Sequence, residues 1–352
     1  MRGLNRIARM LWLGILGAGL PSPSALAGER PCMVAIDVGH SPASPGAISA
    51  SGVPEYEFNR TLSNALVEAF ALQPGFQPIL LLAPGGHDTR KPWTPRERAE
   101  QANALGADLL ISVHHDSVQP SYLTEVHKHG KTFRYSRHAQ GYSLLISRDQ
   151  SCGETRSRRL AEHLGDSLQM RGYRATGHHA EDIDGEHRPW LDPERGIDAF
   201  DRLAVLRHAT MPAVLVEAGV IVHPEEEAEL ANAAAQRRQA GALVAGIVTW
   251  WRESRQPPLT LEQRTDIQSA LNQRAALLEF LGGYSTLDAE SQALKDVRVY
   301  QYRVAERPHD WQILIAPDRE WNEARRILLE QFGVEQLLEV VPRPLLRHEV
   351  LA

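Results

Sequence analysis

The strongest constraint on the fold is a series of short apolar runs separated by segments long enough to form helices. Runs of this length, bounded by polar segments, are typical of strands that are buried on both faces. Strands that alternate with helices form a mostly parallel sheet with helices packed against it. We therefore expect an α/β fold in which helices cover both faces of a mostly parallel sheet. The runs are residues 32–37 (CMVAID), 78–82 (PILLL), 107–113 (ADLLISV) and 212–216 (PAVLV).

The segments between these runs carry recognisable helix signals. Thr94 and Glu97 form a capping box with proline at the first helical position. Residues 141–147 suggest a further strand, and one long helix is expected from Pro224, where residues 225–227 are acidic and suit its first turn. Two other helices are predicted by apolar residues at every fourth position: Phe58, Leu62, Leu66 and Phe70 in the first, and Leu160, Leu164 and Leu168 in the second.

A short linker divides the chain into two predicted domains. Residues 255–258 (RQPP) follow the last helix of the α/β region and mark a boundary between residues 28–254 and residues 259–352. In the second part, a capping box at residues 260–263 begins a helix that ends at two glycines, and two strands and another helix follow. This pattern predicts a small C-terminal α+β module, in which we identify no chemical motif.

The first 27 residues carry the features of a secretory signal peptide. Three arginines precede an apolar run at residues 11–20, and residues 25–27 (ALA) give the small–x–small pattern of a cleavage site. The apolar run is short, because a helix needs about 20 such residues to span a bilayer. We therefore predict that residues 1–27 are a cleaved signal, that the protein is exported to the periplasm, and that it is not an integral membrane protein.

Charge and cysteine content restrict the partners and the chemistry. The formal net charge is -6, and loss of three arginines with the signal makes it more negative. The basic surface expected of a nucleic-acid-binding protein is therefore absent from the sequence. The cysteines are Cys32 and Cys152, and an exported protein meets conditions that permit disulfides. A disulfide and two buried thiols both agree with the sequence.

Polar residues with metal-binding or acid–base chemistry stand where the apolar runs finish. His40 follows the first run, His114 ends the third, and Glu217 ends the last. Because ligands bind outside the carboxyl ends of parallel strands, these side chains should meet at one edge of the sheet. Glu55 is a fourth candidate, at the start of a helix. Two imidazoles and a carboxylate form a common catalytic zinc set that leaves one position for water, and a second carboxylate can accept the proton of that water.

Four segments in order along the chain carry a resemblance to a known family. They are residues 38–47 (VGHSPASPGA), 52–55 (GVPE), 98–114 and 212–219 (PAVLVEAG). In these segments the chain resembles the zinc-dependent N-acetylmuramoyl-L-alanine amidases of the cell-separation type. The resemblance covers about residues 33–250 and does not reach the C-terminal module.

The resemblance implies an activity and a role for each candidate residue. Residues 28–254 would form a zinc amidase domain. In this domain His40, Glu55 and His114 would bind Zn²⁺, and Glu217 would be the general base. The substrate would be peptidoglycan, cut at the amide bond between N-acetylmuramic acid and L-alanine. The resemblance leaves room for an activator protein, which the sequence does not identify.

The sequence departs from the family pattern beside both histidines. Ser41 and Pro42 follow His40 where the family has glycines, and His115 stands where it has a small residue. Successive side chains of a strand point to opposite faces, so only one of the adjacent histidines can face the metal. We assign that role to His114 and expect His115 and Asp116 to support the ligands or contact substrate.

Two long connections, residues 117–140 and 174–201, are rich in histidine. Long loops are usually exposed, which favours polar surface loops. Loops longer than about 12–15 residues can also act as lids. The resemblance adds a third interpretation, because some family members hold an inhibitory segment over the zinc. An acidic side chain from residues 181–186 would have that role here.

Other functions are compatible with parts of the pattern. A zinc peptidase that trims the stem peptide would need a local motif, and HxxE spacing occurs at His178–Glu181 and His223–Glu226. A non-catalytic protein that binds or regulates the wall on an amidase scaffold is favoured only by the departures near the histidines. A serine hydrolase is disfavoured because the G-x-S-x-G motif is absent.

Overall fold

The computed structural model describes residues 30–81, 93–128, 130–150, 153–183, 186–255, 257, 259–343 and 345. The predicted signal peptide and Cys152 lie outside these residues, and Cys32 is buried. Among the helices of the described ranges, none has the length and apolar character needed to cross a membrane.

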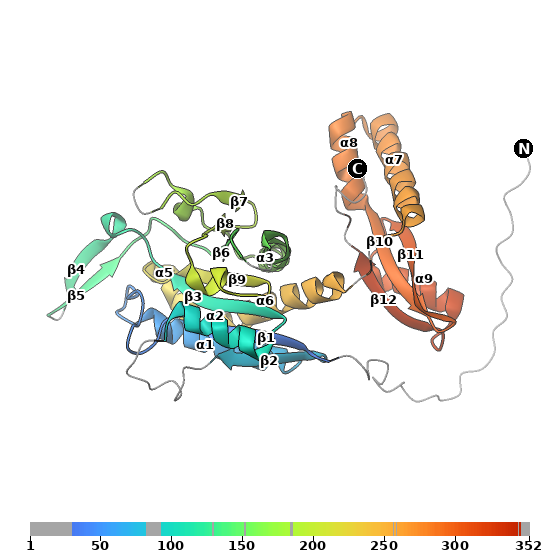
Figure 1. The fold of residues 1–352 in the computed structure, drawn as a ribbon. Coiled ribbons are helices and arrows are strands. Elements are labelled where there is room, and N and C mark those ends of the chain that lie inside the picture. Colours follow the sequence, from blue (N-terminus) through green and yellow to red (C-terminus); the bar gives the residue numbers. More distant parts are fainter. Residues whose placement is uncertain are drawn as a thin grey trace, which may run out of the picture. The chain divides into compact units, whose positions relative to one another are not determined.

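A seven-stranded sheet forms the centre of the larger region, in the order β2-β1-β3-β9-β6-β8-β7 (Figure 1). The pairs β1–β2, β1–β3, β3–β9 and β6–β8 are parallel, whereas β6–β9 and β7–β8 are antiparallel. The mostly parallel sheet is therefore confirmed. Its strands are β1 Cys32–Val38, β2 Phe76–Leu81, β3 Leu109–Asp116, β6 Ser143–Ile146, β7 Trp190–Asp192, β8 Ile197–Ala199 and β9 Ala213–Val220.

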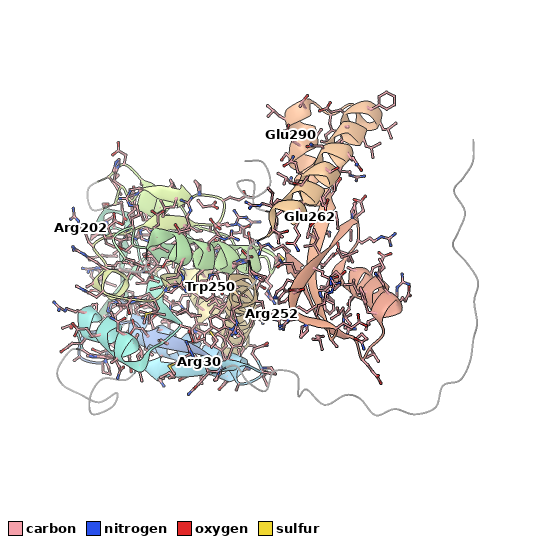
Figure 2. All side chains as sticks on the ribbon, turned by 45° about the vertical axis from the view of Figure 1, so that its right-hand side comes forward. Arg30, Arg202, Trp250, Arg252, Glu262 and Glu290 are labelled. Carbon is pink, nitrogen blue, oxygen red and sulfur yellow. The ribbon has the colours of Figure 1, made fainter. Side chains whose placement is uncertain are left out.

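Helices cover both faces of this sheet because its central strands are apolar on both sides. Ile111 and Val216 face α1, α3 and α6, whereas the adjacent Leu110 and Leu215 face α2 and α4. This alternation is that of a strand buried between two helical layers. Side chains fill the space on both sides of the sheet (Figure 2). The helices are α1 Glu55–Phe70, α2 Pro95–Leu105, α3 Glu154–Gln169, α4 Ala204–Arg207, α5 Pro224–Leu230 and α6 Ala233–Ser254.

The long helix expected from Pro224 is two helices. Helix α5 ends at Leu230, and the Asn232 side chain accepts hydrogen bonds from the backbone N–H groups of Ala234 and Ala235. A cap of this kind begins a new helix and satisfies its free donors. The prediction of one continuous helix was therefore wrong. The residues on both sides of Asn232 favour a helix, so the break at this cap was not recognised in the sequence.

Residues 117–140 are more ordered than a plain loop. They contain the short helix η2 Pro120–Tyr122 and a hairpin of β4 Thr124–Lys128 and β5 Lys131–Tyr135. The hairpin side chains are largely exposed, which explains why they show no buried-strand pattern in the sequence.

The C-terminal α+β module has its own three-stranded antiparallel sheet, in the order β11-β10-β12. Alternate residues of β10 face different helices: Val297 and Val299 pack with α7 and α8, whereas Tyr300 and Tyr302 pack with α9. The capping box at Thr260 is present, as predicted. The elements are α7 Leu261–Gly282, α8 Thr286–Asp296, β10 Val297–Val304, β11 Arg307–Pro317, α9 Trp321–Phe332 and β12 Leu337–Arg343.

Candidate metal and catalytic site

The four residues predicted to carry the chemistry come from neighbouring elements of the sheet. His40 follows β1, Glu55 is the first residue of α1, His114 lies in β3 and Glu217 lies in β9. His114 and Glu217 are register partners on adjacent parallel strands, so their side chains leave the sheet on the same face. The register shifts directly after this pair. Irregularities of this kind are common beside active sites, where they redirect side chains.

Glu55 joins the two histidines. Its Oε2 lies 3.0 Å from His40 Nε2, and its Oε1 lies 3.0 Å from His114 Nδ1. One donor atom from each residue lies within 4.8 Å of the others. Burial alone would raise the pKa of Glu55, but the hydrogen bonds with His114 and His40 hold it well below its usual range. Glu55 is buried, whereas His40 keeps 31% of its side chain exposed, so the group is accessible from solvent.

Two glycines provide the space in which these donors meet. A Cβ atom on Gly39 would lie 2.5 Å from His114 Nε2, and one on Gly46 would lie 2.4 Å from Glu55 Oε2. Gly46 also has a positive φ of 80°, which suits glycine. His40 itself has a φ of 66°, an uncommon conformation for a residue with a side chain. Two imidazoles and a carboxylate in such a cradle fit a divalent metal ion of the zinc type.

Asn59 holds both Glu55 and His115, and the sequence interpretation missed it. Its Nδ2 donates to Glu55 Oε1 at 3.0 Å and to the Gly39 carbonyl at 3.1 Å, while its Oδ1 lies 2.7 Å from His115 Nδ1. The only available signal was a polar residue on the buried stripe of α1, one turn after Glu55.

Arg98 fixes the loop that carries His40. Its Nη1 donates to Asp37 Oδ1 at 2.7 Å and also to the Val38 carbonyl, and its Nη2 donates to the His40 carbonyl at 2.6 Å. Ser112 Oγ donates to the other oxygen of Asp37 at 2.7 Å. Arg98 and Asp37 are both buried, so this ion pair is shielded from water.

His115 and Asp116 follow His114 but point into different surroundings. His115 leaves the opposite face of β3, and its ring lies 5.6 Å from that of Phe58 on α1. Burial lowers the pKa of His115 to about 3. Asp116 is also buried, but its carboxylate meets His178 and His179 rather than the group around Glu55.

Glu217 is a half-buried carboxyl in a negative environment. Its Oε2 is buried and has no hydrogen-bond partner among the described residues. Burial raises the pKa of Glu217 well above its usual range, and the charges of Asp116 and Glu55 raise it further. A carboxyl of this kind, beside the candidate metal ligands, can accept a proton and return it.

The prediction of a polar surface loop for residues 174–201 was wrong for two of its histidines. His178 and His179, in the short helix η3 His178–Ala180, are 6% and 3% exposed. Among the acidic residues proposed for an inhibitory role, Glu181 contacts Tyr122 and His138, and Glu186 contacts His179 and Gln119. Asp182 pairs with His187 at the surface, and Asp184 lies outside the described residues.

The two HxxE pairs do not resemble a peptidase metal site. The His223 side chain caps helix α5 by accepting the Glu226 N–H. The Glu226 carboxylate accepts the N–H groups of Gly141 and Val220, so it joins two loops. In the other pair, His178 is buried and Glu181 bonds to Tyr122.

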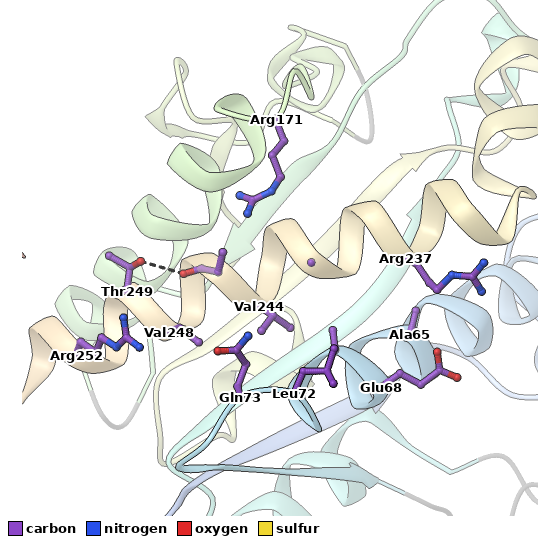
Figure 3. A pocket seen from close by; sticks show the side chains of 13 residues that line it. Ala65, Glu68, Leu72, Gln73, Arg171, Arg237, Val244, Val248, Thr249 and Arg252 are labelled. Atoms are coloured by element: carbon purple, nitrogen blue, oxygen red, sulfur yellow. Dashed lines mark hydrogen bonds between the residues drawn. The ribbon is translucent and has the colours of Figure 1, made fainter. Parts of the chain in front are cut away.

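A groove of about 590 Å³ lies between α1 and α6, and none of the predicted site residues lines it (Figure 3). Its apolar floor includes Ala65 and Val244, and Arg171, Arg237 and Arg252 stand around it. We assign no chemistry to this groove.

Comparison with known proteins gives a family match over most of the described sheet region. The family model described as N-acetylmuramoyl-L-alanine amidase matches residues 34–249. The chain is 30% identical over 239 residues to the probable N-acetylmuramoyl-L-alanine amidase AmiB of Haemophilus influenzae, covering 62% of this chain and 52% of that protein. The chain thus spans about half the length of this relative.

Two further matches are more distant. The uncharacterized protein YqiI of Bacillus subtilis is 27% identical over 252 residues, covering 69% of this chain and 98% of that protein. The crystal structure of the N-acetylmuramyl-L-alanine amidase Ami1 from Mycobacterium smegmatis has a TM-score of 0.49 and 20% identity, covering 63% of this chain and 97% of that chain.

Proposed function

Because the chain belongs to the N-acetylmuramoyl-L-alanine amidase family, we propose that it hydrolyses the amide bond between N-acetylmuramic acid and L-alanine in peptidoglycan. The observation that carries this proposal is the convergence of His40, Glu55 and His114 beside Glu217. The same four residues are those that the amidase resemblance selects. Export to the periplasm, where this substrate lies, is part of the proposal and is supported by the signal-like residues 1–27.

The proposed metal ligands are His40, Glu55 and His114, and the proposed metal is zinc. When bound, zinc in such a site polarises the scissile carbonyl and lowers the pKa of water to about 7. Two imidazoles and a carboxylate leave one position open, and the exposure of His40 gives solvent access to it. Asn59 and Arg98 would keep the ligands in place through Glu55 and the His40 loop.

Glu217 is proposed as the general base and acid. Its carboxylate would accept a proton from the attacking water, whose oxygen then bonds to the lactyl carbonyl carbon. The same carboxyl would return the proton to the alanine nitrogen as the carbon–nitrogen bond breaks. The products would be a free lactyl carboxyl on the sugar and a stem peptide with a free amino terminus.

Product analysis tests the bond that is cut. We expect the purified protein to release stem peptides that begin with alanine from peptidoglycan, and a chelator to abolish this release because the ligands lose their ion. Mass spectrometry of the digest distinguishes the outcomes, with zinc added back to the chelated sample as the control. Shortened stem peptides still attached to sugar would instead identify a peptidase. The absence of any cleavage after zinc loading would support a non-catalytic protein.

Replacing Asn59 with alanine should weaken metal binding by about 10–100-fold, because outer hydrogen bonds orient metal ligands. Asn59 holds Glu55 Oε1 from the same helix. The matched control is Thr61→Ala, which removes an exposed side chain from that helix and should leave the affinity unchanged. Competition with a chromogenic chelator measures both affinities. Equal affinities for the two variants would contradict the positioning role of Asn59.

A further inference from the structure

A second group of metal-binding side chains lies beyond the proposed catalytic residues. It joins Asp116, at the end of β3, to His178 and His179 of η3, which are distant in the sequence. One potential ligand atom from each residue lies within 4.8 Å of the others. All three residues are buried, with exposures of 8%, 6% and 3%. None of them belongs to the group formed by His40, Glu55 and His114.

The two imidazoles present the same ring nitrogen to the same carboxylate oxygen. Asp116 Oδ2 lies 2.6 Å from His179 Nε2 and 3.3 Å from His178 Nε2. The rings lie side by side, with centroids 4.0 Å apart. Three donor atoms therefore converge from one carboxylate and two imidazoles.

The other ring nitrogens have partners on the far side. His179 Nδ1 lies 3.0 Å from Glu186 Oε2, and His178 Nδ1 lies 3.0 Å from Thr176 Oγ1. Metal-binding histidines commonly use one nitrogen in this way, which fixes the tautomer and directs the other nitrogen at the ion. His178 Nε2 also donates a hydrogen bond to the Ser117 carbonyl at 3.2 Å, and it must lose this proton to bind a metal ion.

The inward-facing atoms are close but not well paired. Asp116 Oδ2 and His179 Nε2 form an ion pair at 2.6 Å, but this contact is poorly directed for a hydrogen bond. Buried polar atoms rarely lack hydrogen bonds, and such cases call for a missing partner. Asp198, fully buried on β8, likewise forms no hydrogen bond with a described residue at either carboxylate oxygen, and its charge interacts with those of His179 and Asp116.

A salt bridge alone explains only part of this arrangement. Burial would lower the pKa of His179, but Asp116 and Glu186 on its two nitrogens raise it to about 9. The carboxylates of Asp116 and Glu186 would compensate the charge of a protonated His179. This charge compensation would not explain why His178 Nε2, which bonds the Ser117 carbonyl, also lies 3.3 Å from the same Asp116 oxygen, or why the 2.6 Å contact is poorly directed.

We propose that Asp116, His178 and His179 form a second site for a divalent metal ion of the zinc type. Two imidazoles with a carboxylate suit zinc and leave a fourth position for a further donor, and the burial of all three residues shields the site from solvent. An ion held there ties the connection at residues 174–201 to the end of β3. The inference goes beyond the proposed function and does not depend on it.

Metal stoichiometry of the full chain tests this inference. We expect purified protein loaded with zinc to retain two ions per chain by native mass spectrometry. His114→Ala and His179→Ala should each retain one, and the double variant none. His127→Ala is the matched control, because His127 is an exposed histidine whose ring bonds the Thr132 hydroxyl, and this variant should retain both ions.

The outcomes separate this inference from the proposed catalytic metal. A single wild-type ion that is lost in His114→Ala but kept in His179→Ala would overturn the second site alone. A single ion that is kept in His114→Ala but lost in His179→Ala would support the second site and contradict the proposed catalytic ligands. Should His179→Ala fail to fold, His114→Ala still decides, since its retention of one ion supports the second site and its retention of none overturns it.

Glu186→Gln distinguishes a metal site from a salt bridge that only stabilises the fold. Removing the carboxylate behind His179 should weaken the second ion by about 10–100-fold and leave the first unchanged. Chelator competition on His114→Ala, with and without Glu186→Gln, measures this shift on the second site by itself. An unchanged affinity would overturn the assigned role of His179 as a ligand.

Discussion

Glu217→Gln should reduce the turnover of peptidoglycan by about 10²–10⁴-fold while the protein keeps its metal. Glutamine preserves the shape of the side chain but cannot accept a proton from water. Glu217 is the register partner of His114 and is only half-buried, so its carboxyl is placed to act on water beside the proposed ligands.

Rates of stem-peptide release, measured by mass spectrometry alongside metal content, test this expectation. Glu225→Gln is the control, because Glu225 is an exposed acid of α5 paired with Arg137, and its loss should leave turnover unchanged. Wild-type turnover in Glu217→Gln with its metal still bound would exclude Glu217 as the base. Loss of metal from this variant would show instead that Glu217 contributes to the ligand set.

Arg98→Ala should lower the free energy of unfolding by about 3–5 kcal/mol, because it leaves the buried carboxylate of Asp37 without its cation. The side chains of Arg98 and Asp37 are 7% and 1% exposed, and Arg98 also bonds two backbone carbonyls at the start of the His40 loop. The loss therefore removes both a shielded ion pair and the support of a proposed ligand.

Urea unfolding compares this variant with a matched one on the same helix. Arg96 is exposed and pairs with Glu100 one turn later, so Arg96→Ala should change the free energy of unfolding by less than about 1 kcal/mol. Equal losses for the two variants would mean that the buried ion pair contributes no more than a surface one.

The elements that could be predicted are those whose signals are local. The central strands are continuous apolar runs, α1 shows a regular stripe, and the capping boxes at Thr94 and Thr260 specify helix starts by their own side chains. Helix α8 was missed because its many exposed residues produce no strong apolar pattern. Strand β12 was missed although its sequence, LLEVVPR, is largely apolar.

The same distinction applies to the candidate site. The rule that parallel strands end at one edge was enough to bring His40, His114 and Glu217 together. It could not reveal the role of Asn59, which depends on how α1 packs against β3. Nor could it reveal the burial of His178 and His179, which requires a long connection to fold back onto Asp116. Such contacts join segments that are distant in the sequence, and no local sequence pattern predicts them.

The hydrogen bonds of Arg98 and Asn59 affect whether the protein must bind metal before it can fold. They hold the His40 loop and the Glu55 carboxylate through contacts with protein atoms, so the geometry of the proposed ligands does not depend on an ion to assemble it. The chain can thus complete its α/β fold first and acquire the proposed catalytic ion afterwards. With the export that we propose, the supply of metal would limit when the protein becomes active, but not whether it folds.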